Sequence, residues 1–149
     1  MKRAAVASVA AIVVALAVLG GGYAVAGTAG ADSKPALGPG LVTVDIGIRY
    51  SKFSLSALEV RPGTTVRFLV HNDDPIHHEF IVGDAAVHAR HARGSEAVHP
   101  PVPGEVSVDP FDIGETFYVF DQPGKYEFAC HLPGHFAYGM KGWVTVTEE

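Results

Sequence analysis

One cysteine, one histidine and one methionine lie close together near the C-terminal end of this 149-residue sequence. They are Cys130, His135 and Met140, and four residues separate each from the next. Cys130 is the only cysteine in the chain, so it cannot form an internal disulfide. A thiolate, an imidazole and a thioether form a soft ligand set that favours copper. This spacing therefore predicts one copper ion, held largely by this segment.

A second imidazole has to come from another part of the chain. His78 begins an alternating segment in which Phe80 and Val82 lie on its own face of a strand. Its side chain can therefore point inward, and we favour it over the neighbouring His77, which has the opposite parity. The predicted metal ligands are His78, Cys130, His135 and Met140.

This ligand set suits the transfer of single electrons. The thiolate and the imidazoles accept Cu(II), whereas a weak axial thioether and a low coordination number suit Cu(I). A site whose shape satisfies both oxidation states changes little when an electron arrives. We therefore expect an electron carrier with no enzymatic activity.

Copper binding is not the only function open to Cys130. The thiol could be an ordinary buried core residue, since free cysteine packs well in cores. A nucleophilic pair with His135 is conceivable, but no orienting Asp or Asn and no oxyanion donor can be named for it. Structural zinc usually takes two or more cysteines, and this chain has one.

Alternating apolar and polar residues predict the strands that would position these ligands. Tyr126, Phe128 and Cys130 lie on one face of a strand, and Pro133-Gly134 then turns the chain back toward the thiol. Strands are predicted at 42–48, 53–60, 66–70, 78–82, 105–108, 116–120, 125–130 and 143–147. Many short strands without a βαβ rhythm indicate an all-β, antiparallel sandwich or barrel.

The first 31 residues have the features of an export segment. Lys2 and Arg3 precede an uncharged stretch that extends to Ala31 and contains an apolar run at 11–19. This stretch could be a cleaved signal peptide, or an uncleaved N-terminal anchor, since it is long enough to span a membrane. We therefore expect an exported protein, periplasmic or at the cell surface. Residues 32–40 are predicted to be a linker, and 41–149 the domain.

Charge limits the choice of partners. Without Lys2 and Arg3 the chain has nine basic and sixteen acidic residues, a net charge of −7. Nucleic acids reward basic patches, so a nucleic-acid partner is not expected. The expected partners are redox proteins, not identified by the sequence, and the chain itself is expected to be a monomer.

The segment from Cys130 to Met140, with Gly139 before the methionine, resembles the copper loop of the cupredoxins. His78-Glu79-Phe80 fits the same pattern, and the nearest branch is that of rusticyanin, sulfocyanin and auracyanin. The resemblance implies a Greek-key β-sandwich with a type 1 copper at one end. It also implies that the ring edge of His135 reaches the surface, inside an apolar docking patch.

Two residues depart from the family pattern. Many cupredoxins have Asn after the first ligand histidine, where its side chain ties the two ligand loops together, and Glu79 stands there instead. His131 directly follows Cys130, as in multicopper oxidases, but the further His-x-His pairs of those enzymes are missing. By strand parity, His131 is predicted to be a solvated surface residue.

The stretch at about 84–104 looks like an insertion between strands. Residues 85–93 could form a short helix that carries His88 and His91, with His99 nearby. We expect solvated histidines on a mobile loop, with a weak second metal site as the alternative reading. The alternative function is a copper-handling protein, such as a chaperone, a scavenger or a resistance factor, since the four predicted ligands would serve either role.

Overall fold

A computed structural model of the chain describes residues 36–94 and 101–148. The predicted leader at 1–31, the first part of the predicted linker and His99 lie outside these residues. Leu37 already belongs to the fold, because its amide donates to Glu59 O at 2.9 Å and its carbonyl accepts from Arg61 N at 2.8 Å. Within the described segments, no helix combines the length and hydropathy that crossing a bilayer would require.

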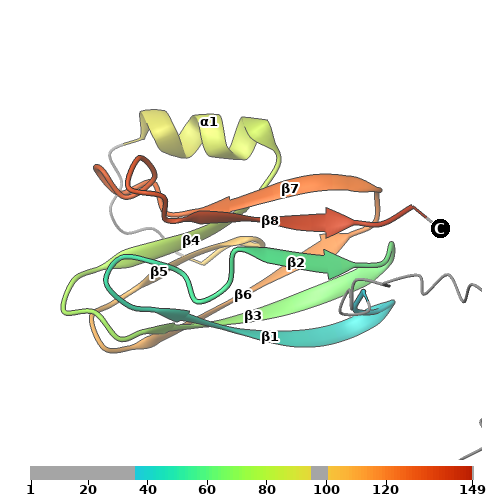
Figure 1. Cartoon of the computed structure of the whole chain (residues 1–149), viewed down its shortest axis with the longest axis horizontal. Coiled ribbons are helices and arrows are strands. Elements are labelled where there is room, and N and C mark those ends of the chain that lie inside the picture. Colours follow the sequence, from blue (N-terminus) through green and yellow to red (C-terminus); the bar gives the residue numbers. More distant parts are fainter. Residues whose placement is uncertain (1–35, 95–100, 149) are drawn as a thin grey trace, which may run out of the picture. The chain divides into compact units, whose positions relative to one another are not determined.

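Strands of the described chain form two sheets that face each other (Figure 1). The smaller sheet has the order β1-β3-β6, made of β1 (Gly40–Ile48), β3 (Thr64–Asn72) and β6 (Ile113–Phe120). The larger has the order β2-β8-β7-β4-β5, made of β2 (Ala57–Val60), β8 (Lys141–Val146), β7 (Gly124–Ala129), β4 (His78–Gly83) and β5 (Glu105–Val108). The predicted all-β sandwich is confirmed.

The prediction of a purely antiparallel arrangement is wrong at two strand pairs. β1 pairs with β3, and β2 with β8, in parallel. The chain leaves β1, crosses to the other sheet for β2 and returns as β3, and such a crossover allows parallel neighbours. The predicted strand at 53–60 is also shorter, because β2 begins at Ala57 and Phe53 forms only an isolated bridge with Ile48.

Aromatic rings fill the space between the sheets. Phe80 lies 4.8 Å from Phe68 and 5.5 Å from Phe128, measured between ring centroids, so rings from both sheets interlock. Cys130 and Met140 are fully buried and belong to the same apolar cluster. The side chains of the predicted copper loop are therefore anchored in the core.

The predicted helix at 85–93 is confirmed as α1 (Ala85–Arg93), which packs on β4 and β7 (Figure 1). Asp84 caps it, since its carboxylate accepts from the amides of Ala86 and Val87 at 2.9 and 3.0 Å. The expectation of solvated histidines on a mobile loop is wrong for His88, which is only 7% exposed. α1 holds this histidine against the larger sheet.

Candidate metal centre

Three of the predicted ligands meet at one end of the sandwich. The donor atoms of His78, Cys130 and His135 all lie within 4.8 Å of one another. Cys130 Sγ is 3.3 Å from His135 Nδ1, and the rings of His78 and His135 are 4.9 Å apart between centroids. His77 points elsewhere, with its Nδ1 2.9 Å from Asp109 Oδ1 and about half of its side chain exposed.

The loop between β7 and β8 folds back on itself through its own backbone. Met140 N donates to His135 O at 3.0 Å, and Cys130 N donates to Met140 O at 3.1 Å. Gly134 and Gly139 have φ angles of 86° and 94°, in the left-handed region that glycine enters without steric cost. The loop therefore brings Met140 back beside Cys130, and its side chain is fully buried there.

A buried carboxylate orients His78. Asp74 Oδ2 lies 3.0 Å from His78 Nε2, and the Asp74 carboxylate also accepts from the amides of Tyr50 and Ser51 at 2.7 Å each. Burial alone would raise the pKa of Asp74, but these two amides and His78 hold the pKa below its ordinary value. The ionised carboxylate can only accept a hydrogen bond, so Nε2 carries the proton and the lone pair of neutral His78 is on Nδ1.

His78 Nδ1 is the polar atom that tests whether a metal fits. It is buried and has no hydrogen-bond partner in the described protein. Buried polar atoms are rarely left without a partner, so this nitrogen needs an explanation. His78 belongs with Cys130 and His135 to the group whose donor atoms lie within 4.8 Å of one another, and Nδ1 is the nitrogen that its contact with Asp74 leaves for a metal.

Glu79 stands where many cupredoxins have the asparagine that ties the two ligand loops together. Its side chain is 2% exposed, and its Oε1 accepts from the amide of His131 at 2.6 Å. One end of this contact is next to His78 and the other is next to Cys130. A carboxylate thus joins the two ligand segments where many relatives use an amide.

The two histidines of this site are ready to bind a metal at neutral pH, whereas the thiol must first lose its proton. Burial raises the pKa of Cys130 to about 11, so the metal-free thiol keeps its proton at neutral pH. Burial lowers the pKa of both His78 and His135, which are therefore neutral ligands near pH 7. A metal ion has to displace one proton, that of the thiol.

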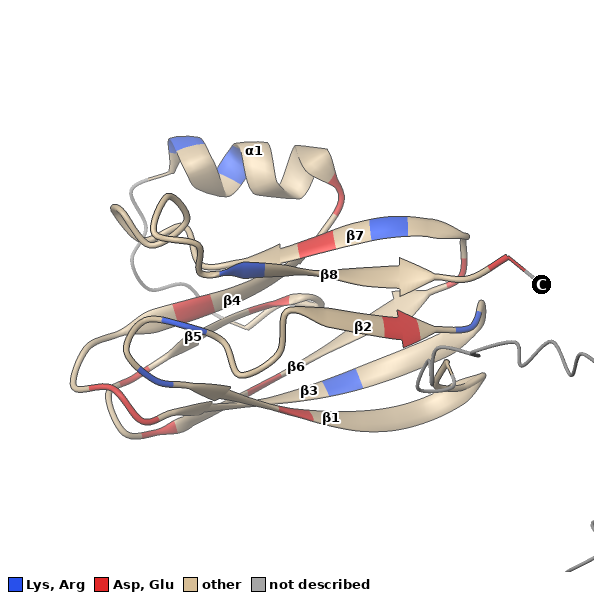
Figure 2. Cartoon of the chain, in the orientation of Figure 1, with Lys and Arg blue, Asp and Glu red and all other residues tan. Residues whose placement is uncertain are grey.

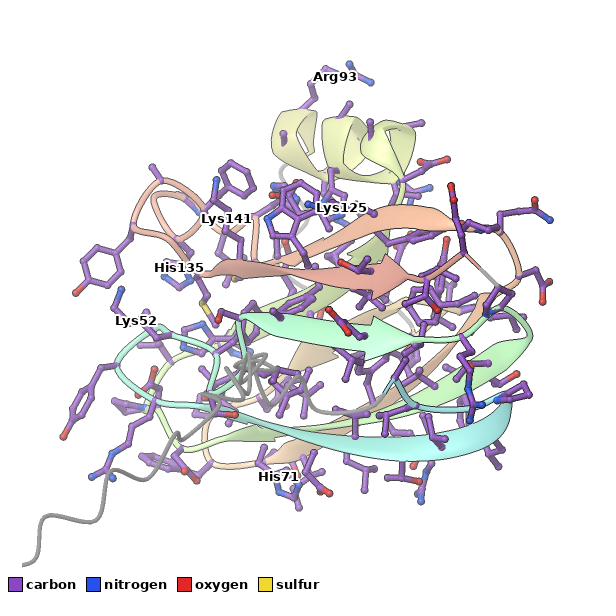
Figure 3. The ribbon with its side chains drawn as sticks, turned by 45° about the vertical axis from the view of Figure 1, so that its right-hand side comes forward. Lys52, His71, Arg93, Lys125, His135 and Lys141 are labelled. Atoms are coloured by element: carbon purple, nitrogen blue, oxygen red, sulfur yellow. The ribbon has the colours of Figure 1, made fainter. Side chains whose placement is uncertain are left out.

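His135 is the ligand nearest the surface. It is half-buried, whereas His78, Cys130 and Met140 are fully buried. Figure 3 shows it at the same end of the fold as two lysines. The lysine nitrogens lie over aromatic rings of the neighbourhood, Lys52 4.3 Å from the centroid of Tyr138 and Lys141 4.2 Å from that of Phe136.

The prediction that His131 is solvated is wrong. Its parity is as expected, on the face opposite to the core, but α1 covers that face. The ring of His131 stacks on Phe136 at 5.2 Å and lies 5.1 Å from the ring of His88. Burial, with the neighbouring His88 and His91, lowers the pKa of His131 to about 4.

Comparisons with known proteins agree with this geometry. The model of the copper-binding plastocyanin/azurin family matches residues 41–147. The copper-resistant cuproprotein CopI of Pseudomonas aeruginosa is 31% identical over 138 residues, which cover 70% of this chain and 75% of the relative. CopI of Rubrivivax gelatinosus is 40% identical over 98 residues, which cover 64% of this chain and 59% of the relative.

Solved structures share this fold. Auracyanin A of Chloroflexus aurantiacus, a blue copper protein, is 26% identical with a TM-score of 0.58, covering 72% of this chain and 100% of that one. An auracyanin of Roseiflexus castenholzii, at 22% identity, shares the fold with a TM-score of 0.60, over 71% of this chain and 97% of its own. The chain is a member of the plastocyanin/azurin family of copper-binding proteins.

Proposed function

We propose that this chain is an exported blue copper protein that carries single electrons through one type 1 copper. His78 Nδ1, Cys130 Sγ and His135 Nδ1 are the strong ligands, and the Met140 thioether is the weak axial one. The observation that carries the proposal is the unpartnered Nδ1 of His78, buried beside a thiol that is itself 3.3 Å from a second imidazole nitrogen.

The surroundings of these ligands support electron transfer. Asp74 fixes His78, Glu79 joins the two ligand segments, and the loop backbone fixes Met140. A site held in this way rearranges little between Cu(II) and Cu(I), which keeps electron transfer fast. The half-buried His135 gives the electron its shortest route to a partner.

The rim around His135 indicates what such a partner would look like. Aromatic residues of the copper loop surround it, and Tyr138 is 63% exposed. Figure 2 shows acidic residues on strands of both sheets, while Lys141 begins β8 at the copper loop. An apolar patch bordered by Lys52 and Lys141 suits a redox partner with acidic residues around its own docking surface.

Addition of Cu(II) to the purified chain tests this function. Thiolate-to-copper charge transfer should give an intense visible band, and Cys130→Ser should abolish it in a folded protein. His78→Gln should weaken copper binding strongly, whereas the matched control His77→Gln should leave it unchanged. A wild-type chain that stays colourless with stoichiometric Cu(II), without reducing it, would rule the proposal out.

A second candidate function is copper handling, which the similarity to two copper-resistant cuproproteins favours. The same ligands could hold copper for storage or delivery instead of for electron transfer. Two measurements separate the roles: retention of copper during repeated redox cycles, and the rate of copper exchange with a chelator. An electron carrier keeps its copper while it cycles between oxidation states, whereas a copper-handling protein exchanges copper with a competing chelator on the time scale of its task.

Export is the part of the proposal that rests on residues 1–31. Fractionation of the native producer should place the protein outside the cytoplasm. N-terminal sequencing should find either cleavage after Ala26 or Ala31, or an intact N-terminal anchor. A soluble cytoplasmic pool that begins at Met1 would contradict export.

A further inference from the structure

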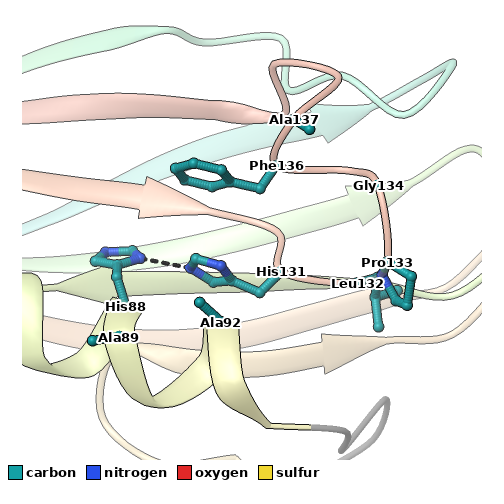
Figure 4. Close-up of a pocket in the computed structure, with 9 residues that line it drawn as sticks. All are labelled: His88, Ala89, Ala92, His131, Leu132, Pro133, Gly134, Phe136 and Ala137. Carbon is teal, nitrogen blue, oxygen red and sulfur yellow. Dashed lines mark hydrogen bonds between the residues drawn. The ribbon is translucent and has the colours of Figure 1, made fainter.

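Three histidines that are not type 1 ligands gather between α1 and the segment after β7. His88 and His91 are three residues apart on α1 and share one face of it. His88 Nδ1 lies 2.8 Å from His131 Nε2, the contact drawn as a dashed line in Figure 4. The ring of His91 lies against that of His131, with 6.0 Å between centroids and 24° between planes.

A backbone carbonyl determines which ring nitrogen of His88 carries the proton. Its Nε2 lies 2.9 Å from Glu127 O, and a carbonyl only accepts, so Nε2 carries the proton. In neutral His88 the lone pair is therefore on Nδ1 and is directed at His131. Metal-binding histidines usually donate their other ring N–H in this way to a carbonyl or a carboxylate. His78 shows the same arrangement, with Asp74 as the acceptor.

The two facing nitrogens have nearly the spacing of a shared metal ion. Two imidazole nitrogens at about 2.0–2.1 Å from one ion lie about 2.9–3.4 Å apart for bond angles between a right angle and a tetrahedral angle. The observed 2.8 Å needs only a small opening, provided that the proton of His131 moves from Nε2 to Nδ1, so that both facing nitrogens offer a lone pair to the ion. The ring centroids of His88 and His131 are 5.1 Å apart, close to the 4.9 Å of His78 and His135.

A pocket gives an ion access to this pair. Its volume is about 460 Å³, and His88, His131 and Phe136 line it with small residues between them (Figure 4). The small residues are Ala89, Ala92, Gly134 and Ala137. They leave the imidazole edges within reach of solvent, so water in the pocket can fill the remaining coordination positions.

Nearby carboxylates favour a cation here. His91 Nε2 lies 2.9 Å from Glu105 Oε2, and His91 Nδ1 lies 3.9 Å from Glu79 Oε2. Arg90 pairs with Glu105 and offsets one of these two negative charges.

We propose that His88 Nδ1 and His131 Nε2 form a second metal site, which binds a divalent copper or zinc ion from solution. We expect copper to bind more tightly than zinc, because the affinity of imidazole sites is higher for Cu(II) than for Zn(II). The site is separate from the type 1 ligands and goes beyond the proposed electron transfer. Because His131 directly follows Cys130, the two proposed sites have ligands at adjacent positions of the chain.

The experiment uses the full chain already loaded with one copper and titrates a second equivalent of Cu(II) at neutral pH. Calorimetry should show a second binding event. Electron paramagnetic resonance should show a nitrogen-coordinated copper, and the visible spectrum should gain no new thiolate-to-copper band. His88→Gln should weaken this second event by about tenfold or more and leave the blue band unchanged. The matched control is His71→Gln, at a partly exposed histidine on β3 paired with Asp45, which should leave both events unchanged.

Two results would overturn the second site: a wild-type chain that binds no second copper, and a second event that His88→Gln does not weaken. If His88→Gln does not fold, His131→Gln provides the same comparison from the other ligand. The titration is repeated with Cys130→Ser, which lacks the blue site. Failure of the blue band and failure of the second site therefore appear as separate results.

Discussion

Asp74 accepts a hydrogen bond from His78 Nε2 at 3.0 Å, and this contact leaves Nδ1 as the nitrogen that His78 can offer to a metal shared with Cys130. The carboxylate is itself held by two backbone amides of the loop after β1. That loop therefore helps to orient a copper ligand that lies more than twenty residues further along the chain.

Asp74→Asn should weaken copper binding by about tenfold to a hundredfold, because the substituted amide cannot accept all three hydrogen bonds. The ring of His78 would then lose its fixed orientation. Competition with a calibrated chelator measures the affinity. Asp73→Asn, at the exposed neighbouring position, is the control and should bind copper as wild type does. Equal affinities for the two variants would show that Asp74 has no orienting role.

Glu79→Gln should raise the reduction potential. Glu79 is a buried carboxylate next to a copper ligand, and a negative charge there stabilises Cu(II) over Cu(I). Glutamine keeps an acceptor for His131 N, so the loops should stay joined. Voltammetry measures the shift, with Glu59→Gln, on the exposed side of β2, as the control. A potential that falls in Glu79→Gln would contradict this electrostatic role.

Met140→Leu should keep the copper and also raise the reduction potential, since a weak axial thioether tunes the ion more than it holds it. The volume of the side chain is nearly conserved, so the core at the copper loop should remain packed. Spectroscopy and voltammetry of the copper-loaded variant provide the test. Complete loss of copper would show that Met140 is a structural necessity of the site and not a tuning ligand.

Copper loading should release about one proton per ion at about pH 7.5. The thiol of Cys130, with its pKa raised to about 11, supplies that proton, whereas His78 and His135 have lowered pKa values and are already neutral. Affinity should therefore rise by about tenfold per pH unit from neutral pH up to the thiol pKa. Titration in a weakly buffered solution measures the release. A value near zero would mean that the thiolate exists before the metal arrives.

Strand parity was sufficient to predict that Cys130 faces the core and that His78, not His77, points inward. The spacing from Cys130 to Met140 was sufficient to predict that one loop returns to the thiol. Both conclusions depend on local periodicity, which a sequence displays directly.

The contacts that orient the ligands could not be predicted in the same way. Asp74 reaches backbone amides more than twenty residues away, and Glu79 reaches the amide of His131 across neighbouring strands. These contacts depend on how loops meet after the sheets form. The cover over His131 was missed because nothing local shows which sheet face a helix will pack on. The only available signal was the shared helical face of His88 and His91.

X-ray absorption at the copper edge, on the chain loaded with one equivalent of copper, tests the proposed ligand set, because it identifies the atoms bound to the metal. We expect one short copper–sulfur bond and two imidazole nitrogens. The short sulfur bond should disappear in Cys130→Ser, and one imidazole should disappear in His78→Gln. A first coordination shell of nitrogen and oxygen alone in the wild-type chain would contradict copper binding by Cys130.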